Sequence, residues 1–291
     1  MYMNGIIIIN KPSGYTSQDV ISKVKKIMNV KKVGHTGTLD PMATGVLPVL
    51  LGNATKLSKY LIEHDKTYVS TIKLGEKRDT GDSEGSIIEK KDADIDFNSV
   101  ESVLNTFLGV QKQTPPIYSA IKVKGKKLYE YARANEQVVI PEREIEIYDI
   151  KLKSIDNKNH EIIFEVNCSK GTYIRVLSEN ISEKLGTVGY MKELRRTKVN
   201  KFDIENSITL EELEQNINNE LFIKNNIITM EKVFENYDKI IIGDKKKELF
   251  LNGVMLTFDK KDGIYNIYSE KKGYIGTGIV KNKLLKRDVI I

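Results

Sequence analysis

Apolar residues in this chain occur in short runs, and this spacing restricts the fold to one assembled from many short elements. Four consecutive isoleucines, Ile6–Ile9, predict a buried strand. An apolar residue at every second position from Ile162 to Cys168 predicts another strand over Glu161–Ser169. No run approaches the roughly 20 apolar residues that a membrane-spanning helix needs. We therefore expect a mixed α+β protein that does not span a membrane.

Helices are expected between the strands. Ser17–Met28 carries an apolar stripe and has Thr16 as its N-cap, and Thr209 with Glu212 forms a capping box for a short helix. Further helices are expected over Ala54–Glu63, Asn98–Leu108, with an Asn cap, Leu128–Asn135 and Thr172–Leu185. Further strands are expected over Val46–Leu51, Lys66–Gly75 and Glu144–Ser154.

The last part of the chain has a different pattern. Residues Asn216–Asn236 are rich in Asn and Ile with weak periodicity, and we interpret them as a linker. From Asp238 onward, short β-like runs alternate with turns, which predicts a small β-barrel. The expected division is therefore a domain over 1–236 and a small β domain over 237–291.

Positive charge is concentrated in that small domain. Residues Asp238–Ile291 hold 12 basic and 7 acidic side chains, an excess of five, while the whole chain carries +6. A second basic stretch runs from Lys122 to Arg133. This distribution is compatible with an acidic partner such as a nucleic acid, and equally with a solvated lysine-rich surface.

The cysteine and histidine content limits the chemistry. Cys168 is the one cysteine, so no intramolecular disulfide can form, and we expect a cytoplasmic protein. The N-terminus also lacks the basic segment and cleavage site of a signal peptide. With one cysteine and three histidines, a structural zinc site is not expected.

One loop stands out as a place for chemistry, the stretch GHTGTLDP over Gly34–Pro41. Its carboxylate, Asp40, lies in a glycine-rich loop just before a predicted buried strand, so a rigid scaffold would hold it in an exposed position. Pro41 restricts the backbone of Asp40 to extended conformations. The alternative is an aspartate that merely begins a turn before proline, and local chemistry alone favours that alternative.

Six sequence blocks occur in a fixed order along the chain. They are GIIIINKPSGYTS (Gly5–Ser17), GHTGTLDPMATGVLP (Gly34–Pro48), KTYVSTIKLGEKRDTGDSEG (Lys66–Gly85), PPIYSAIKVKGKKLYEYAR (Pro115–Arg133), CSKGTYIRVL (Cys168–Leu177) and LRRTKV (Leu194–Val199). Together and in this order, they resemble the bacterial tRNA pseudouridine-55 synthase family, the TruB type. The resemblance implies a catalytic domain with a largely antiparallel sheet, an RNA-clamping insertion at about 115–137 and a C-terminal PUA-like β-barrel. It also implies a monomer that isomerises a tRNA T-loop uridine without cofactor or metal.

The resemblance assigns the reacting groups. Asp40 matches the catalytic aspartate, and Arg175 matches the basic residue that pairs with it. A guanidinium fork would lower the pKa of the carboxylate and fix its orientation. Tyr68 matches the tyrosine that stacks on the target uracil, and one proposed mechanism also has it take a proton from the sugar.

Further residues match the family's substrate pocket. Tyr173 matches a second pocket tyrosine, and Leu194 matches an apolar residue that lines the uracil site. His35 matches the residue that fills the space left when the uridine is extruded from the loop, a step that costs a few kcal/mol. Lys11 and Lys56 are candidates for phosphate contacts or for support of the pocket.

The segment Ile117–Asn135 resembles the RNA-clamping insertion. Its basic side chains alternate with tyrosines, a pattern that suits a folded RNA. The basic residues are Lys122, Lys124, Lys126, Lys127 and Arg133, and the tyrosines are Tyr118, Tyr129 and Tyr131.

Two other functions remain open. A non-catalytic RNA-binding or RNA-folding protein would use the same basic residues, but it gives no reason for Asp40, Tyr68 and Arg175 to occur together. An unrelated hydrolase could use Asp40 with His35, although no motif supplies a serine nucleophile and no metal-ligand spacing is visible.

Overall fold

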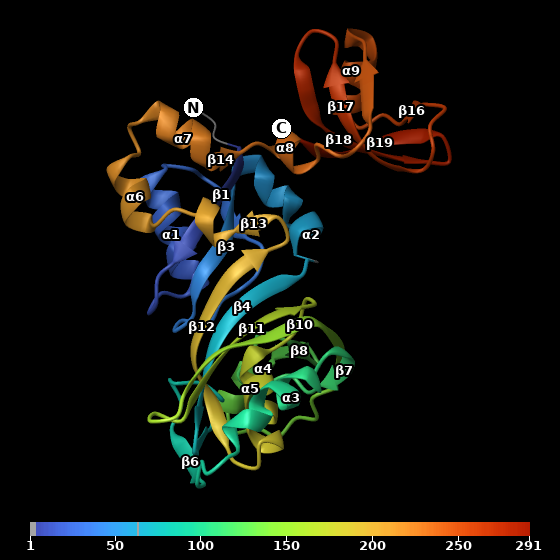
Figure 1. Cartoon of the computed structure of the whole chain (residues 1–291). Helices are drawn as coiled ribbons and strands as arrows, with labels where there is room; N and C mark the ends of the chain where they lie inside the picture. Colours follow the sequence, from blue (N-terminus) through green and yellow to red (C-terminus); the bar gives the residue numbers. More distant parts are fainter. Residues whose placement is uncertain (1–3, 63) are drawn as a thin grey trace.

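The structure is a computed structural model that describes residues 4–62 and 64–291. Within this part of the chain, ten strands form one large sheet (Figure 1). Eight of them follow the order β14-β1-β3-β12-β4-β11-β10-β7, while β2 pairs with β3 and β13 with β12. Their bounds are β1 Gly5–Lys11, β2 Val33–His35, β3 Thr44–Leu51, β4 Lys66–Leu74, β7 Gly109–Gln113, β10 Arg143–Asp156, β11 Glu161–Cys168, β12 Gly189–Val199, β13 Phe202–Asp203 and β14 Ile227–Ile228. Neighbours run antiparallel except β12 and β3, which confirms the expected mixed, largely antiparallel sheet.

Helices cover the sheet and enclose its apolar side chains. One core lies between α5 (Ile174–Lys184), α3 (Val100–Asn105) and strands β4, β10, β11 and β12. A second core lies between α1 (Ser17–Ile27), α6 (Leu210–Gln215) and strands β1 and β3. Among the residues described, no helix is both long and apolar enough to cross a bilayer.

Two predicted helices begin at the caps that the sequence indicates, and two others begin differently. Thr16 and Thr209 cap α1 and α6, each in a capping box. The helix expected over Ala54–Glu63 is instead a 3₁₀ turn, η1 (Gly52–Leu57), followed by the one-turn helix α2 (Ser58–Leu61), and Glu63 lies outside the described residues. The helix expected at Asn98 is preceded by the 3₁₀ turn η2 (Phe97–Ser99), which Asp96 caps.

Two regions interrupt the main sheet. A two-stranded ribbon, β5 (Glu76–Arg78) and β6 (Ile87–Lys90), carries the acidic turn Asp79–Gly85. The insertion contains the short hairpin β8 (Lys122–Val123) and β9 (Lys126–Lys127) and then the helix α4 (Leu128–Arg133). The insertion therefore combines a hairpin with a helix that begins at Leu128, where the sequence predicts one.

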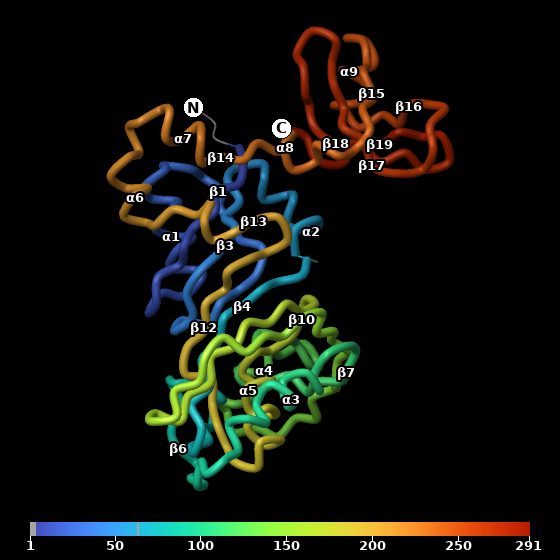
Figure 2. The backbone as a smooth tube through the Cα atoms, viewed as in Figure 1, coloured from blue at the N-terminus to red at the C-terminus, as the bar shows by residue number. Residues whose placement is uncertain are grey.

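The expectation of a linker over Asn216–Asn236 is wrong. This segment forms α7 (Glu220–Asn226), β14 and α8 (Met230–Val233), and β14 pairs with β1 in the main sheet. Met230 and Phe234 are buried in the core beneath. Figure 2 shows the segment passing from α6 by way of β1 to the C-terminal strands.

The C-terminal strands form a separate curled sheet of the PUA-like type. Its order is β15-β17-β18-β19-β16, and β15 and β16 at its ends are not paired with each other, so the sheet is a half-barrel. The bounds are β15 Lys239–Ile242, β16 Leu256–Thr257, β17 Gly263–Ser269, β18 Gly273–Lys281 and β19 Leu284–Ile290. One helix, α9 (Asp244–Leu251), follows β15 and was not predicted from the sequence. The three-residue turn η3 (Ile204–Asn206) completes the elements.

Candidate active site

The loop that carries Asp40 lies between β2 and β3 and is tied to the scaffold on both sides of that residue. On one side, the Leu39 amide donates to Ser17 Oγ at 2.9 Å. On the other side, the Pro41 carbonyl accepts from Lys11 Nζ at 2.9 Å and from the Gly14 amide at 3.0 Å. The Asp40 side chain remains 35% exposed. The loop thus presents a reachable carboxylate on a fixed backbone.

Arg175 meets Asp40 from the first turn of α5. Its Nε lies 3.1 Å from Asp40 Oδ2, and its side chain is 6% exposed. The two terminal nitrogens hold other groups, the carbonyls of Thr80 at 3.1 Å and Tyr118 at 3.0 Å. The guanidinium therefore does not grip Asp40 with two nitrogens, as the expected fork would. It joins the Asp40 loop, the ribbon turn and the insertion.

Asp82 is part of this ion-pair group, although the sequence marks it only as one residue of the block Lys66–Gly85. Its Oδ2 lies 3.6 Å from Arg175 NH1, and its side chain is 5% exposed. Its Oδ1 accepts from Thr80 Oγ1 at 2.6 Å and from the Glu84 amide at 3.1 Å. Two carboxylates, Asp40 and Asp82, thus share one buried arginine.

The pKa of Asp40 is raised from its ordinary value, contrary to the lowering that pairing with Arg175 predicts. Burial is the largest cause, and the Asp82 charge adds to it. Arg175 and Lys11 act in the opposite direction but do not reverse the shift. The carboxylate is therefore less extensively hydrated than an ordinary aspartate.

Tyr68 lies on β4 and is 7% exposed, in the same core as Leu39 and Leu194. Burial raises its pKa to about 12, while the nearby Arg196 guanidinium opposes that rise. Leu39, the residue before Asp40, packs in the same core as Tyr68, which brings the Asp40 loop to this strand. Leu194 is 8% exposed on β12, opposite Ser70 of β4. The structure thus gathers Asp40, Arg175, Tyr68 and Leu194 at one place.

His35 ends β2 and is half-buried. Its Nδ1 accepts from the Gly37 amide at 3.2 Å, so the imidazole stiffens the glycine-rich loop. Burial and the Arg196 charge lower the pKa of His35. The ring is therefore neutral near pH 7.

Tyr173 precedes α5 and is held by a side-chain amide that the sequence did not single out. Its backbone N–H donates to Gln113 Oε1 at 2.8 Å, and its carbonyl accepts from Gln113 Nε2 at 3.1 Å. Gln113, at the end of β7, is 5% exposed. This two-point contact fixes the start of the helix that carries Arg175.

The two single lysines occupy different environments. Lys11 is completely buried, and its amino group donates to the carbonyls of Pro12, Tyr15 and Pro41 at 2.9, 2.5 and 2.9 Å. Burial lowers its pKa to about 8. Its three protons are therefore used within the protein, which suits pocket support rather than a phosphate contact. Lys56 is exposed on η1.

The basic side chains of the insertion are stacked on its tyrosines. Lys126 lies over the Tyr131 ring at 4.7 Å, while Lys127 and Arg133 lie over the Tyr129 ring at 5.2 and 5.4 Å. Lys126 also pairs with Glu136 at 2.8 Å. Lys122 and Lys124 are exposed on the hairpin. The structure does not bring these basic residues into the Asp40 group.

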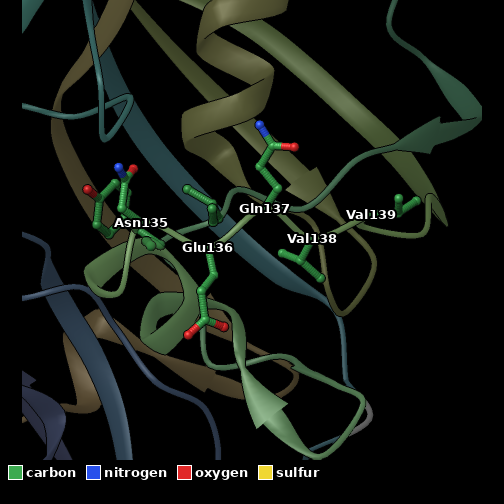
Figure 3. A pocket seen from close by; sticks show the side chains of 8 residues that line it. Asn135, Glu136, Gln137, Val138 and Val139 are labelled. Carbon is green, nitrogen blue, oxygen red and sulfur yellow. The ribbon is translucent and has the colours of Figure 1, made fainter.

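A hollow of about 600 Å³ lies at the insertion, and Figure 3 shows the side chains that line it. Glu136 and Gln137 project to opposite sides of that segment (Figure 3). The hollow is lined by eight residues, Ile117, Tyr118, Ala132, Asn135, Glu136, Gln137, Val138 and Val139. Because the Tyr118 carbonyl also accepts from Arg175, the hollow adjoins the active-site group. Among the described residues, no three His, Cys, Asp or Glu side chains gather in a metal-binding arrangement.

Comparison with known families gives two consecutive matches. The description "TruB family pseudouridylate synthase (N terminal domain)" matches residues 25–174. The description "tRNA pseudouridylate synthase B C-terminal domain" matches residues 175–239. The first match alone covers more than half of the chain.

Comparison with individual proteins agrees. The chain is 40% identical over 289 residues to a protein named tRNA pseudouridine synthase B from Caldanaerobacter subterraneus subsp. tengcongensis, with 98% of each chain covered. It is 44% identical over 283 residues to a protein of the same name from Clostridium tetani, with 95% of each covered. A solved structure titled as an H/ACA RNP bound to a substrate RNA containing 2′-deoxyuridine matches with 25% identity and a TM-score of 0.70, covering 99% of this chain and 85% of the other.

Proposed function

This chain belongs to the TruB family of pseudouridylate synthases, and on that premise we propose that it isomerises uridine 55 in the T-loop of tRNA to pseudouridine. The observation that carries this proposal is the pairing of a partly exposed Asp40 with the buried Arg175 at 3.1 Å, beside Tyr68.

The reaction breaks the N1–C1′ glycosidic bond and rejoins the uracil through C5, and the atoms of substrate and product balance without a further reactant. Asp40 is the carboxylate that acts at the sugar–base junction, and Arg175 keeps its oxygen aimed there. Because burial partly desolvates Asp40, its charge interacts more strongly with the reacting nucleotide than it would in bulk water. Tyr68 and Leu194 form the flat and apolar sides of the uracil site.

Access to Asp40 requires extrusion of the uridine from the T-loop. We assign His35 to the space that the base vacates and Tyr173 to the uracil pocket. The neutral imidazole of His35 suits stacking within an RNA loop because it adds no desolvated charge.

Recognition of the rest of the tRNA falls to the insertion and the small β domain. We propose residues 1–236 as the catalytic unit and 237–291 as an RNA-binding unit, acting as a cytoplasmic monomer. Cations stacked on Tyr129 and Tyr131 form a surface that can meet phosphates while the rings contact bases or sugars. Exposed Lys122, Lys124 and Lys56 supply additional phosphate contacts.

Tritium release from tRNA labelled at C5 of uridine tests the reaction, because C5 loses its hydrogen when it bonds to C1′. Wild type is expected to release tritium, and Asp40→Asn is expected to bind tRNA but to release essentially none. Asp149→Asn, a carboxylate on β10 paired with Lys151, is the matched control and should retain full activity.

The position of the modified nucleotide in the tRNA is tested separately. Carbodiimide treatment and primer extension should stop one nucleotide before position 55, and a transcript with cytidine at that position should release nothing. Tritium release from the cytidine transcript would contradict the assigned nucleotide but leave the reaction intact. Wild-type turnover by Asp40→Asn would overturn the catalytic role.

A further inference from the structure

Arg196 is the largest of the fully buried side chains, and its charge has an unusual environment. It is 1% exposed on the central strand β12. Among the residues described, no carboxylate forms an ion pair with it. Its partners are instead three backbone carbonyls, of Val46 at 2.8 Å, Gly37 at 3.1 Å and Thr38 at 3.4 Å. A buried cation without a counter-ion is costly, so the position calls for an explanation.

The three carbonyls belong to the segment that carries Asp40. Gly37 and Thr38 precede Asp40 in the loop, and Val46 follows it in β3. The three guanidinium nitrogens each face one carbonyl, which a lysine ammonium on a single flexible stem cannot reproduce in the same geometry. Arg196 therefore spans the base of the loop and holds its two ends together.

The same residue is directly opposite Tyr68. Strand β12 lies between β3 and β4, and Arg196 pairs in register with Gly45 on one side and with Tyr68 on the other. Its positive charge acts on the Tyr68 hydroxyl in the direction that favours proton loss. One side chain thus contacts the Asp40 loop and influences the tyrosine.

From this geometry we propose that Arg196 is a positioning residue for the isomerisation: it locks the Asp40 loop to the strand of Tyr68, and its uncompensated charge polarises the Tyr68 hydroxyl. This inference rests on the proposed function. It adds a residue that acts through Asp40 and Tyr68 rather than on the uridine itself.

The neighbouring residue provides a matched control. Arg195 has the same side chain one position earlier, but it is exposed on the opposite face of β12. The comparison uses the full-length variants Arg196→Gln, Arg196→Lys, Arg195→Gln and Arg195→Lys. Single-turnover tritium release is measured at saturating tRNA, and the Kd for tRNA is measured by filter binding.

Arg196→Gln is expected to slow the reaction roughly 100-fold, because a small displacement of a reacting group has an effect of that size. Arg196→Lys keeps the charge and should recover part of the rate. Both should bind tRNA with a Kd within about threefold of wild type, and both Arg195 variants should react within about threefold, since neither contacts the reacting groups. If Arg196→Gln does not fold, Arg196→Lys alone is expected to react about tenfold more slowly, since it loses only part of the positioning.

The proposed effect of Arg196 on the Tyr68 hydroxyl is tested by a double-mutant cycle and by a spectroscopic titration. The rate losses of Tyr68→Phe and Arg196→Gln should not multiply in the double variant, because both remove one coupled unit. With fluorotyrosine at position 68, the ¹⁹F titration should move to higher pH in Arg196→Gln and stay unchanged in Arg195→Gln.

Three results would overturn the inference: a wild-type rate for Arg196→Gln, rate losses that multiply, or an unmoved ¹⁹F titration. If wild type releases no tritium, the proposed function fails instead. The ¹⁹F titration still reports the charge coupling in that case, because it requires no turnover.

Discussion

Asp40 is subject to two opposing influences, and their balance determines its chemistry. Burial and Asp82 favour its neutral form, whereas Arg175 and Lys11 favour its charge. Because the net shift is upward, the folded protein binds the Asp40 proton more tightly than the unfolded chain does. Ionised Asp40 therefore costs stability above its folded pKa, and this cost disappears as the pH falls below the ordinary pKa of aspartate.

The upward shift of the Asp40 pKa predicts how Asp40→Asn changes thermal stability. At pH 7 the variant removes a partly desolvated charge, and Arg175 keeps Asp82 and the carbonyls of Thr80 and Tyr118 as partners. Its Tm is expected to equal or exceed that of wild type, while activity is lost. Thermal denaturation at pH 7 and pH 4 tests this, and any gain should shrink at pH 4. A clear fall in Tm at pH 7 would contradict the proposed balance.

Asp82 gives a prediction for activity against pH. Asp82→Asn removes a like charge that raises the pKa of Asp40, and it leaves more of the Arg175 charge to Asp40. The acid side of the rate profile should therefore move to lower pH, measured as single-turnover tritium release between about pH 4.5 and pH 8.

The contrasting variants sharpen that test. Arg175→Gln removes the largest effect that lowers the Asp40 pKa, so its acid limb should move to higher pH. Asp79→Asn lies in the same turn, where its Oδ1 accepts from the Ser86 amide, and it should leave the profile in place. Movement of the Asp82→Asn profile toward higher pH would refute the coupling.

The sequence predicts Asp40, Tyr68 and Arg175 as site residues because motif context marks them. It does not identify Asp82 or Arg196, since their roles come from contacts between distant segments. Asp82 meets Arg175 across 93 positions of sequence, and Arg196 reaches carbonyls about 150 positions away. From sequence alone, a charged residue inside a basic or acidic run is predicted to be exposed. The structure shows that Asp82 and Arg196 are buried.

At the level of elements, β12 is the long strand that the sequence pattern does not predict. It lies in the middle of the sheet between β3 and β4, yet MKELRRTK contains four basic side chains and one acidic one. Its inward positions, including Leu194 and Arg196, alternate with exposed ones, and the inward arginine interrupts the apolar pattern. The segment Asn216–Asn236 is not predicted as ordered structure for a different reason. Its helices and strand are too short to show a periodic apolar pattern.

The β3–β12 contact yields a prediction for Gly45. This residue has φ +104°, and a Cβ there would lie 2.1 Å from the Arg196 carbonyl oxygen. Gly45→Ala should therefore destabilise the fold by more than about 3 kcal/mol or prevent folding, because backbone cannot yield as a side chain can. Urea denaturation measures the change.

Gly186→Ala is the control for the backbone conformation alone. Gly186 has φ +87°, and no atom lies within 4 Å of the position that a Cβ would take there. Its alanine variant should lose only about 1 kcal/mol. Equal losses at the two positions would show that the close approach of β12 contributes nothing.

At the scale of the whole molecule, the C-terminal curled sheet contacts the main sheet region through its last strand. Val289 of β19 is buried in a core that also contains Ile6, Ala54 and Phe234. Beside it, Asp288 pairs with Lys59 and accepts from Tyr60 Oη at 2.6 Å and from Thr277 Oγ1 at 3.0 Å. The sheet formed by β15 to β19 is therefore in direct apolar and polar contact with the main sheet region, and the domain boundary near residue 236 stays a prediction.

Asp288→Asn tests how firmly this junction sets the position of the basic domain. The side chain is 5% exposed, and an amide cannot accept at both oxygen positions, so either Lys59 or the two hydroxyls lose an acceptor. Leaving such a group unsatisfied costs about 1–3 kcal/mol. Because the junction and not the interior of either sheet is affected, hydrogen exchange should quicken in β19 and α2 while β11 stays protected.

Asp259→Asn, whose exposed pair with Lys283 lies in the same domain, should change neither exchange nor tRNA affinity. Equal exchange in the two variants would mean that apolar packing around Val289 alone holds the domains together.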